Sequence, residues 1–230
     1  MFGLEALASV ARVFYFVLFL NRPILSNLLQ ALIELHYLPS VPFFQLAFSH
    51  EKLLIEQHEH YQKNSFRNRC YIATANGLLC LSIPLRKGKN EQQAILDVRI
   101  AHDEPWQQRH WRGIQSAYGN APYFVYYADA IAPFFQRKYD YLFEWNWDLL
   151  QLLFRLLSLD TVIQKTTAYD TEVQSPVLDY REQFKPGKLP SMKVTYPQLF
   201  VEKHGFLPNL SILDLLFCVG PQASMYLSEN

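Results

Sequence analysis

Short apolar runs separated by polar or turn-forming residues dominate the chain after its first thirty residues. Residues 31–38 (ALIELHYL) and 52–57 (KLLIEQ) are such runs, and both are typical of buried strands. The segment between them, residues 41–49, carries Pro42 where the first turn of a helix tolerates proline. The order strand, short helix, strand predicts a parallel crossover.

A second pair of apolar runs, residues 69–75 and 78–85, flanks Asn76-Gly77. This dipeptide between two β-type runs predicts a hairpin, because a type I′ turn needs positive φ at both central residues. Pairing outward from the turn sets Ala75 against Leu78 and Cys70 against Ile83. Residues 95–100 alternate in character and predict one more strand.

The periodicity becomes helical after Asp103, which is a plausible N-cap. Helices are predicted over 106–118, from Pro122 to a break or kink at Pro133, and over 139–157. Residues 161–165 suggest a short strand, and the polar segment 168–190 suggests a loop. Ser211 begins a capping-box variant before a last apolar helix.

These elements predict a mixed α/β fold with one domain. Its central mixed sheet would combine the strands at 31–38, 52–57 and 95–100 with the β-hairpin at Asn76-Gly77, and the helices would pack on it. We place the domain at residues 31–227.

Residues 1–30 form an apolar extension outside this domain. The run at 13–20 (VFYFVLFL) is too short to cross a bilayer, which takes about 20 residues. A start site assigned too far upstream, an anchoring or amphipathic helix, and a cleaved signal all fit the pattern. We expect residues 1–28 to make few contacts with the domain.

Composition narrows the function classes. Half of the residues are hydrophobic and 15% are aromatic, which excludes a disordered chain. Lys and Arg together equal Asp and Glu at 21 each, so binding to nucleic acid through net charge is not expected. Three cysteines make no disulfide framework. No glycine-rich phosphate loop occurs, so no cofactor is predicted, and membrane contact is expected only through residues 1–30.

The most specific polar cluster is Arg67-Asn68-Arg69. Two guanidinium groups on one face of a strand would form a bidentate site for carboxylate or phosphate, and Gln62 and Asn68 would add neutral hydrogen bonds. The alternative is structural, with Asp97, Glu104 or Asp129 neutralising the pair inside the fold.

Histidines supply further candidates. His110, on the predicted helix 106–118, has the ordinary pKa of a general acid or base, although a helical His beside Trp is more often packed in a core. Tyr118 ends the same helix, within an aromatic patch. His58 and His60 would share one face of a strand, with Glu59 nearby as a possible base, but a third ligand is not evident and no metal site is predicted.

The order of these motifs resembles the WbqC-like protein family of bacteria, closest to its Bacteroidetes-type members. The resemblance covers about residues 31–227, although many relatives carry a His-Gln-Pro-Asn-Tyr segment where this chain reads Leu35-His36-Tyr37. The segments that carry it are His36-Tyr37-Leu38-Pro39-Ser40, Gln62 with Arg67-Asn68-Arg69, Asn76-Gly77, Trp106 with His110-Trp111, Ala117-Tyr118, Asn146, Tyr196-Pro197-Gln198 and Pro208-Asn209-Leu210-Ser211.

The resemblance implies a cytoplasmic, transferase-type enzyme that acts on a small anionic or sugar-linked metabolite in surface polysaccharide biosynthesis. In that case Arg67 and Arg69 would hold the substrate, and His110 would move a proton beside Tyr118. Gln62, Asn68 and Asn146 would orient the substrate. The alternative is a non-catalytic protein that binds a metabolite or assists a biosynthetic complex. Both hypotheses gain if Arg67, Arg69, His110 and Tyr118 converge on one cleft.

Overall fold

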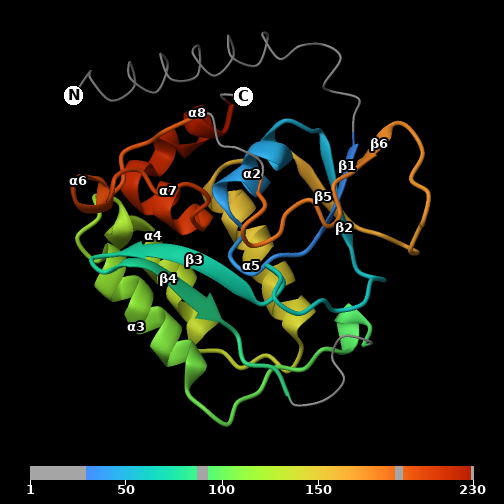
Figure 1. The fold of residues 1–230 in the computed structure, drawn as a ribbon, viewed down its shortest axis with the longest axis horizontal. Helices are drawn as coiled ribbons and strands as arrows, with labels where there is room; N and C mark the ends of the chain where they lie inside the picture. Colours follow the sequence, from blue (N-terminus) through green and yellow to red (C-terminus); the bar gives the residue numbers. More distant parts are fainter. Residues whose placement is uncertain (1–29, 87–92, 190–193, 229–230) are drawn as a thin grey trace, which may run out of the picture.

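The computed structural model describes residues 30–86, 93–189 and 194–228 (Figure 1). The predicted extension at residues 1–30 therefore lies outside the described residues except for Gln30, and its interpretations stay predictions. None of the described helices is long and apolar enough to cross a membrane.

A four-stranded parallel sheet combines two strands from the first quarter of the chain with two from its second half. Its strands are β1 (Gln30–Glu34), β2 (Lys52–Glu56), β5 (Val162–Lys165) and β6 (Val177–Asp179), in the order β5-β2-β1-β6. Helix α2 (Val41–Phe48) joins β1 to β2, which pair in parallel with Ile33 opposite Ile55, so the predicted crossover is confirmed. Strand β6 lies inside the segment predicted as loop. Only three of its residues pair with β1, and so short a strand leaves no clear pattern in the sequence.

The predicted hairpin is confirmed as β3 (Arg69–Thr74) and β4 (Gly77–Ser82), but these strands form a sheet of their own. The expected single mixed sheet is thus a parallel sheet and a separate antiparallel pair. The register also differs, since Thr74 pairs with Gly77 and Cys70 with Leu81. Thr74 Oγ1 accepts the N–H of Asn76 and donates to the carbonyl of Gly77, which fixes the turn one residue earlier than predicted.

The prediction of a strand at 95–100 is wrong. Residues Ile95–Asp97 form the 3₁₀ helix η3, and only isolated bridges follow it. The backbone bonds of this segment go to the loop before α5, with Leu142 N–H donating to the carbonyl of Val98 and Ile100 N–H to that of Asp140. The alternation of buried and exposed side chains over residues 95–100 therefore belongs to an irregular segment and not to a strand.

The helices largely follow the predicted pattern. They are α3 (Trp106–Tyr118), α4 (Phe124–Ile131), the 3₁₀ helix η4 (Ala132–Phe135) and α5 (Leu142–Leu156). The change from α4 to η4 occurs at Pro133, which lacks the N–H that an α-helix needs. Trp145 of α5 sits in the core, with Tyr37, Trp106 and Phe135 around its ring.

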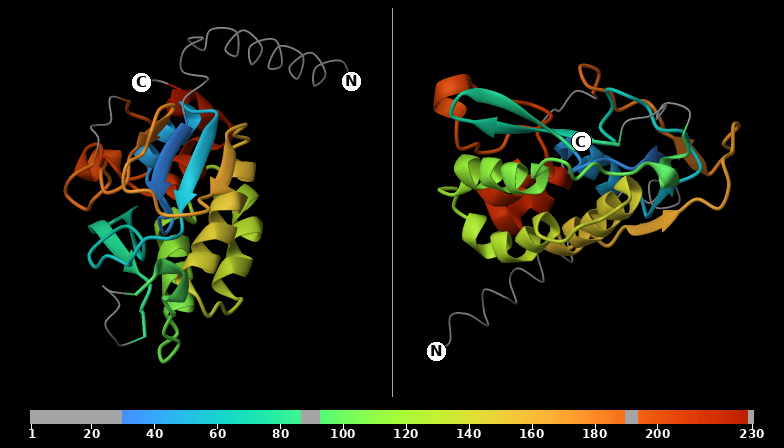
Figure 2. Two further views of the ribbon diagram at one scale, coloured as in Figure 1. Left: turned by 90° about the vertical axis from the view of Figure 1, so that its right-hand side faces the viewer. Right: turned by 90° about the horizontal axis from the view of Figure 1, so that it is seen from below.

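The C-terminal segment completes the core with α6 (Val201–His204), α7 (Ile212–Val219), η5 (Gly220–Gln222) and α8 (Ala223–Ser228). Every residue of α7 is buried, and Ser211 caps it by accepting the N–H of Leu213. Figure 2 shows the parallel strands beside α5, with the hairpin packed against α3. The mixed α/β, single-domain fold is as predicted.

Candidate active site at the carboxyl ends of the parallel strands

Polar residues gather where the parallel strands end. In open parallel sheets ligands bind outside the carboxyl ends, at the point where the strand order reverses. Here the chain proceeds from β1 to β2 and β5 on one side and later returns to place β6 on the other side of β1. Glu34 ends β1, Glu56 ends β2, and Asp179 ends β6, so this edge of the sheet is rich in carboxylates.

A cleft of about 670 Å³ opens at this edge. Its lining includes His58, Glu59, Gln62, Tyr169, Arg181 and Glu182. Most come from the segment after β2 and from the turn after β6, which the sheet brings to the same edge on either side of β1. His60 also lines the cleft, but the described residues contain no group of three side chains suited to a metal ion.

Glu59, which lines the cleft, forms a buried ion pair with Arg67. Their side chains are 8% and 2% exposed. Arg67 Nε donates to Glu59 Oε1 at 2.7 Å, and Nη2 donates to Oε2, so the guanidinium fork grips the carboxylate with both arms. Burial raises the pKa of Glu59 to about 7 although Arg67 opposes the rise. A carboxyl group with that pKa can accept a proton near neutral pH.

Glu34 and His36 lie behind this ion pair, with His36 Nε2 3.3 Å from Glu34 Oε1. Burial lowers the pKa of His36, whose ring is enclosed by Phe43, Phe66 and Phe184. Glu34 Oε2 accepts the backbone N–H of Glu182 at 3.0 Å. The end of β1 therefore anchors the turn that forms one side of the cleft.

Arg181 fastens the opposite side. Its guanidinium contacts Asp179 at 2.7 Å and Glu56 at 3.1 Å, donates to the carbonyl of Asp170 at 2.7 Å, and lies 4.6 Å from the centre of the Tyr169 ring. Both buried guanidinium groups of the site are thus occupied by protein carboxylates. The groups left for a ligand are mainly hydrogen-bond acceptors.

The sequence-predicted residues divide into two groups. Gln62 lines the cleft and donates to Glu182, and Arg67 fixes Glu59. Asn68 accepts from the Tyr61 hydroxyl and donates to the carbonyl of Ile83, and Asn146 Nδ2 donates to the carbonyl of Arg67 at 2.7 Å. Both amides hold the backbone around Arg67.

The lining of this cleft includes none of the four groups that were predicted to converge, namely Arg67, Arg69, His110 and Tyr118. The Tyr37 hydroxyl lies 2.7 Å from Nδ1 of His110, and burial lowers the His110 pKa to about 4. The Tyr118 hydroxyl donates to Asp214 at 2.8 Å inside the core. Arg69 begins β3, half-buried. Their catalytic and binding roles stay predictions.

The alternative prediction, that acidic residues of the protein neutralise Arg67 and Arg69, named the wrong residues for Arg67. Arg67 is neutralised by Glu59 rather than by Asp97, Glu104 or Asp129. The sequence alone gave no specific indication of Arg181, and it indicated Glu59 only as a possible base beside two histidines, not as the partner of Arg67. The one available signal was the acidic and basic residues near the end of the polar segment 168–190, which only the sheet topology brings to the cleft.

Comparison with known proteins places these residues in a family. Residues 35–186 match the WbqC-like protein family. The chain belongs to this family. The match includes Glu59, Arg67 and Arg181, so the ion pairs of the cleft lie within the WbqC-like region. The uncharacterized protein Rv1507c of Mycobacterium tuberculosis is 28% identical, over 86% of this WbqC-like chain and 96% of its own. No solved structure matches the chain.

Proposed function

We propose that this WbqC-like protein is a transferase-type enzyme that acts on a small sugar-linked metabolite. In this proposal Glu59 accepts the proton of the attacking hydroxyl or amine. The observation that carries the proposal is the buried, Arg67-bound carboxyl group of Glu59 in the wall of a cleft at the carboxyl ends of parallel strands. The family resemblance supports a place in surface polysaccharide biosynthesis.

The lining of the cleft favours a sugar over an anion. Asp179 and Glu182 also line it, and Arg67 and Arg181 already hold protein carboxylates. A phosphate or carboxylate would meet like charge, whereas sugar hydroxyls donate hydrogen bonds to such acceptors. The exposed ring of Tyr169 adds an aromatic surface of the kind on which a sugar ring packs.

The chemistry requires little of the protein beyond placement and proton transfer. The acceptor hydroxyl or amine attacks an activated donor, a new bond forms to the transferred group, and the leaving group departs with its electron pair. The Glu59 carboxylate takes the proton released by the nucleophile. Arg67 holds that carboxylate in one orientation, which is the condition for efficient general base catalysis.

The second candidate is a non-catalytic metabolite-binding protein. It is favoured by the dense internal pairing of the cleft, in which Gln62, Glu182 and Glu34 form one chain of hydrogen bonds. Such a preformed surface binds a ligand at low ordering cost without any reaction.

Native mass spectrometry against nucleotide sugars, amino sugars and acyl donors tests the proposal, followed by a turnover assay of the combinations that bind. For an active pair we expect kcat to rise with pH through about 7, because Glu59 must be ionised to act as a base. Glu59→Gln should lower kcat by about 10²–10⁴-fold and leave substrate binding within a few-fold. Glu202→Gln, an exposed change on α6, is the matched control.

The outcomes separate the two candidates. Turnover that survives Glu59→Gln in a folded protein would refute the role of Glu59. Saturable binding with no turnover for any donor and acceptor pair would favour the binding protein. Absence of binding to every sugar-linked probe would overturn the substrate class.

A further inference from the structure

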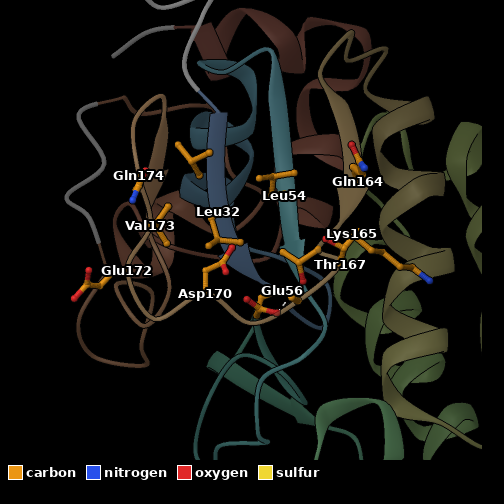
Figure 3. A pocket seen from close by; sticks show the side chains of 13 residues that line it. Leu32, Leu54, Glu56, Gln164, Lys165, Thr167, Asp170, Glu172, Val173 and Gln174 are labelled. Atoms are coloured by element: carbon orange, nitrogen blue, oxygen red, sulfur yellow. Dashed lines mark hydrogen bonds between the residues drawn. The ribbon is translucent and has the colours of Figure 1, made fainter.

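The second face of the parallel sheet is only partly covered, since Leu32 is 4% exposed and Leu54 is half-buried. Parallel sheets are normally covered on both faces by helices. Here Ala31, Ile33, Leu53 and Ile55 are fully buried, while Leu32 and Leu54, directly opposite each other, point to the other face (Figure 3). In the close view α2 lies behind the strands, and in front of them lies the loop between β5 and β6.

A pocket of about 460 Å³ lies on this second face. Its floor is apolar, formed by Leu32 and Leu54, and its rim carries Gln164, Asp170 and Glu172. The volume lies within the range of small-molecule sites. The pocket is separate from the Glu59 cleft, because the two share no lining residue.

One carboxylate of the rim is placed to meet a ligand. Asp170 extends over Leu32 toward the ends of the strands, whereas Glu172 and Lys165 point away from the floor (Figure 3). Glu56, also in the lining, is already bound by Arg181 and by Thr166. In the described part of the chain no cationic side chain pairs with the Asp170 carboxylate, and Arg181 holds the loop in place through the Asp170 carbonyl.

We infer that this pocket binds a small primary ammonium ion with an apolar body. The apolar body covers Leu32 and Leu54, and the ammonium group donates hydrogen bonds to the Asp170 carboxylate. Two features support this occupant, namely a partly covered apolar floor, in which Leu54 is the more accessible side chain, and the exposed Asp170 carboxylate beside it. An anionic ligand is disfavoured, because the only cationic side chain of the lining points away. This inference is independent of the proposed function.

Isothermal titration calorimetry on the full chain at pH 7 tests the inference with three probes of matched shape: 2-phenylethylamine, 2-phenylethanol and phenylacetate. We expect the amine to bind, the alcohol to bind at least tenfold more weakly, and phenylacetate not to bind. Asp170→Asn should weaken the amine at least tenfold. Glu172→Gln, on the same rim with its carboxylate turned away, should change the affinity less than twofold.

Leu54→Ser gives a second readout, since it removes part of the floor and should weaken the amine and the alcohol alike. Equal binding of amine and alcohol, or amine binding that survives Asp170→Asn, would overturn the inference. So would sedimentation data that show a dimer through this face, dissociated by Leu54→Arg, because the floor would then be covered by a second copy.

Discussion

Buried carboxyl groups show how single residues set the properties of this protein. Glu59 and Asp214 are both buried, and burial raises their pKa values to about 7 and about 6. Glu59 faces a guanidinium group at the wall of a cleft, whereas Asp214 accepts a hydrogen bond from Tyr118 within the core. The same physical effect therefore gives a candidate base at one place and a structural acceptor at the other.

Asp214 should make the protein less stable as the pH rises from about 4 to about 6. The folded carboxyl group binds its proton more tightly than the unfolded one, so stability is present below the unfolded pKa and is lost as the pH passes the folded value. The Asp214→Asn variant has no carboxyl group at this position and should not lose stability in this way. Between pH 4 and 7.5 the variant should gain about 1–3 kcal/mol relative to the wild type.

Urea unfolding at the two pH values measures the change, and Asp160→Asn is the exposed control. Because every other titrating group is shared, the difference between variant and wild type isolates residue 214. A difference that does not change with pH would show that the pKa of Asp214 is the same in the folded and unfolded states.

Substitution of Arg67 should lower the free energy of unfolding, because the buried Glu59 carboxylate then lacks a counter-charge. Arg67→Met keeps most of the side-chain volume but leaves Glu59 without its cation, and we expect a loss of about 3–5 kcal/mol at pH 8. The loss should shrink at pH 5, where Glu59 is protonated. Chemical unfolding at both pH values tests this. Exposed Arg112→Met should change stability by under about 0.5 kcal/mol, and an equally small effect at Arg67 would contradict the buried pair.

At the scale of elements, periodicity and turn residues predicted those helices and strands whose hydrogen bonds are local in sequence. The helical periodicity and the Gly119 stop give α3 its observed limits of Trp106–Tyr118, and the turn residues give the hairpin. Residues 95–100 and β6 could not be predicted in the same way, because their backbone bonds go to residues far along the chain.

The candidate site was harder to predict than the fold for the same reason. A bidentate site of Arg67 and Arg69 was expected for a ligand, whereas Arg67 binds the carboxylate of Glu59, whose pKa is raised by burial. Arg181 reaches Glu56 across 125 positions of sequence. The hydrogen-bonded partner of His110, the hydroxyl of Tyr37, comes from another element altogether.

Among the glycines in the described part of the chain, Gly220 at the junction between α7 and η5 should be the least tolerant of a side chain. Gly220 has φ of +58°, and a Cβ added there would lie 2.4 Å from the Tyr123 ring. Gly220→Ala should therefore destabilise by about 2–5 kcal/mol, since overpacking adds to the strain of a positive φ.

Gly187→Ala separates the two contributions. Gly187 also has a positive φ, of +82°, but nothing lies within 4 Å of the added Cβ. This control should cost only about 1–2 kcal/mol, the strain of the backbone alone. Thermal and urea unfolding compare the two variants, and equal losses would mean that Tyr123 moves aside freely.

At the scale of the whole molecule, the folded unit extends beyond the region that matches the family. The match ends at residue 186, yet α7 is wholly buried and is bonded to both halves of the fold. Ser211 N–H donates to the carbonyl of Tyr71 beside the hairpin, and Ile212 N–H donates to that of Pro39 after β1. The C-terminal segment therefore joins the parallel sheet to the antiparallel pair.

A chain that ends at Gly187 should consequently fail to fold on its own. Without α7 it exposes the apolar surfaces that Leu213, Leu216 and Phe217 cover, and we expect loss of cooperative thermal unfolding together with strong binding of a hydrophobic dye. Co-expression of residues 188–230 as a separate chain should restore a cooperative transition and yield a stable two-chain complex. Because the cut falls at an exposed position, rescue of this kind distinguishes a missing part of the core from damage at the new terminus. A truncated chain that melts cooperatively near the temperature of the full protein would contradict this view and make the C-terminal helices an appendage.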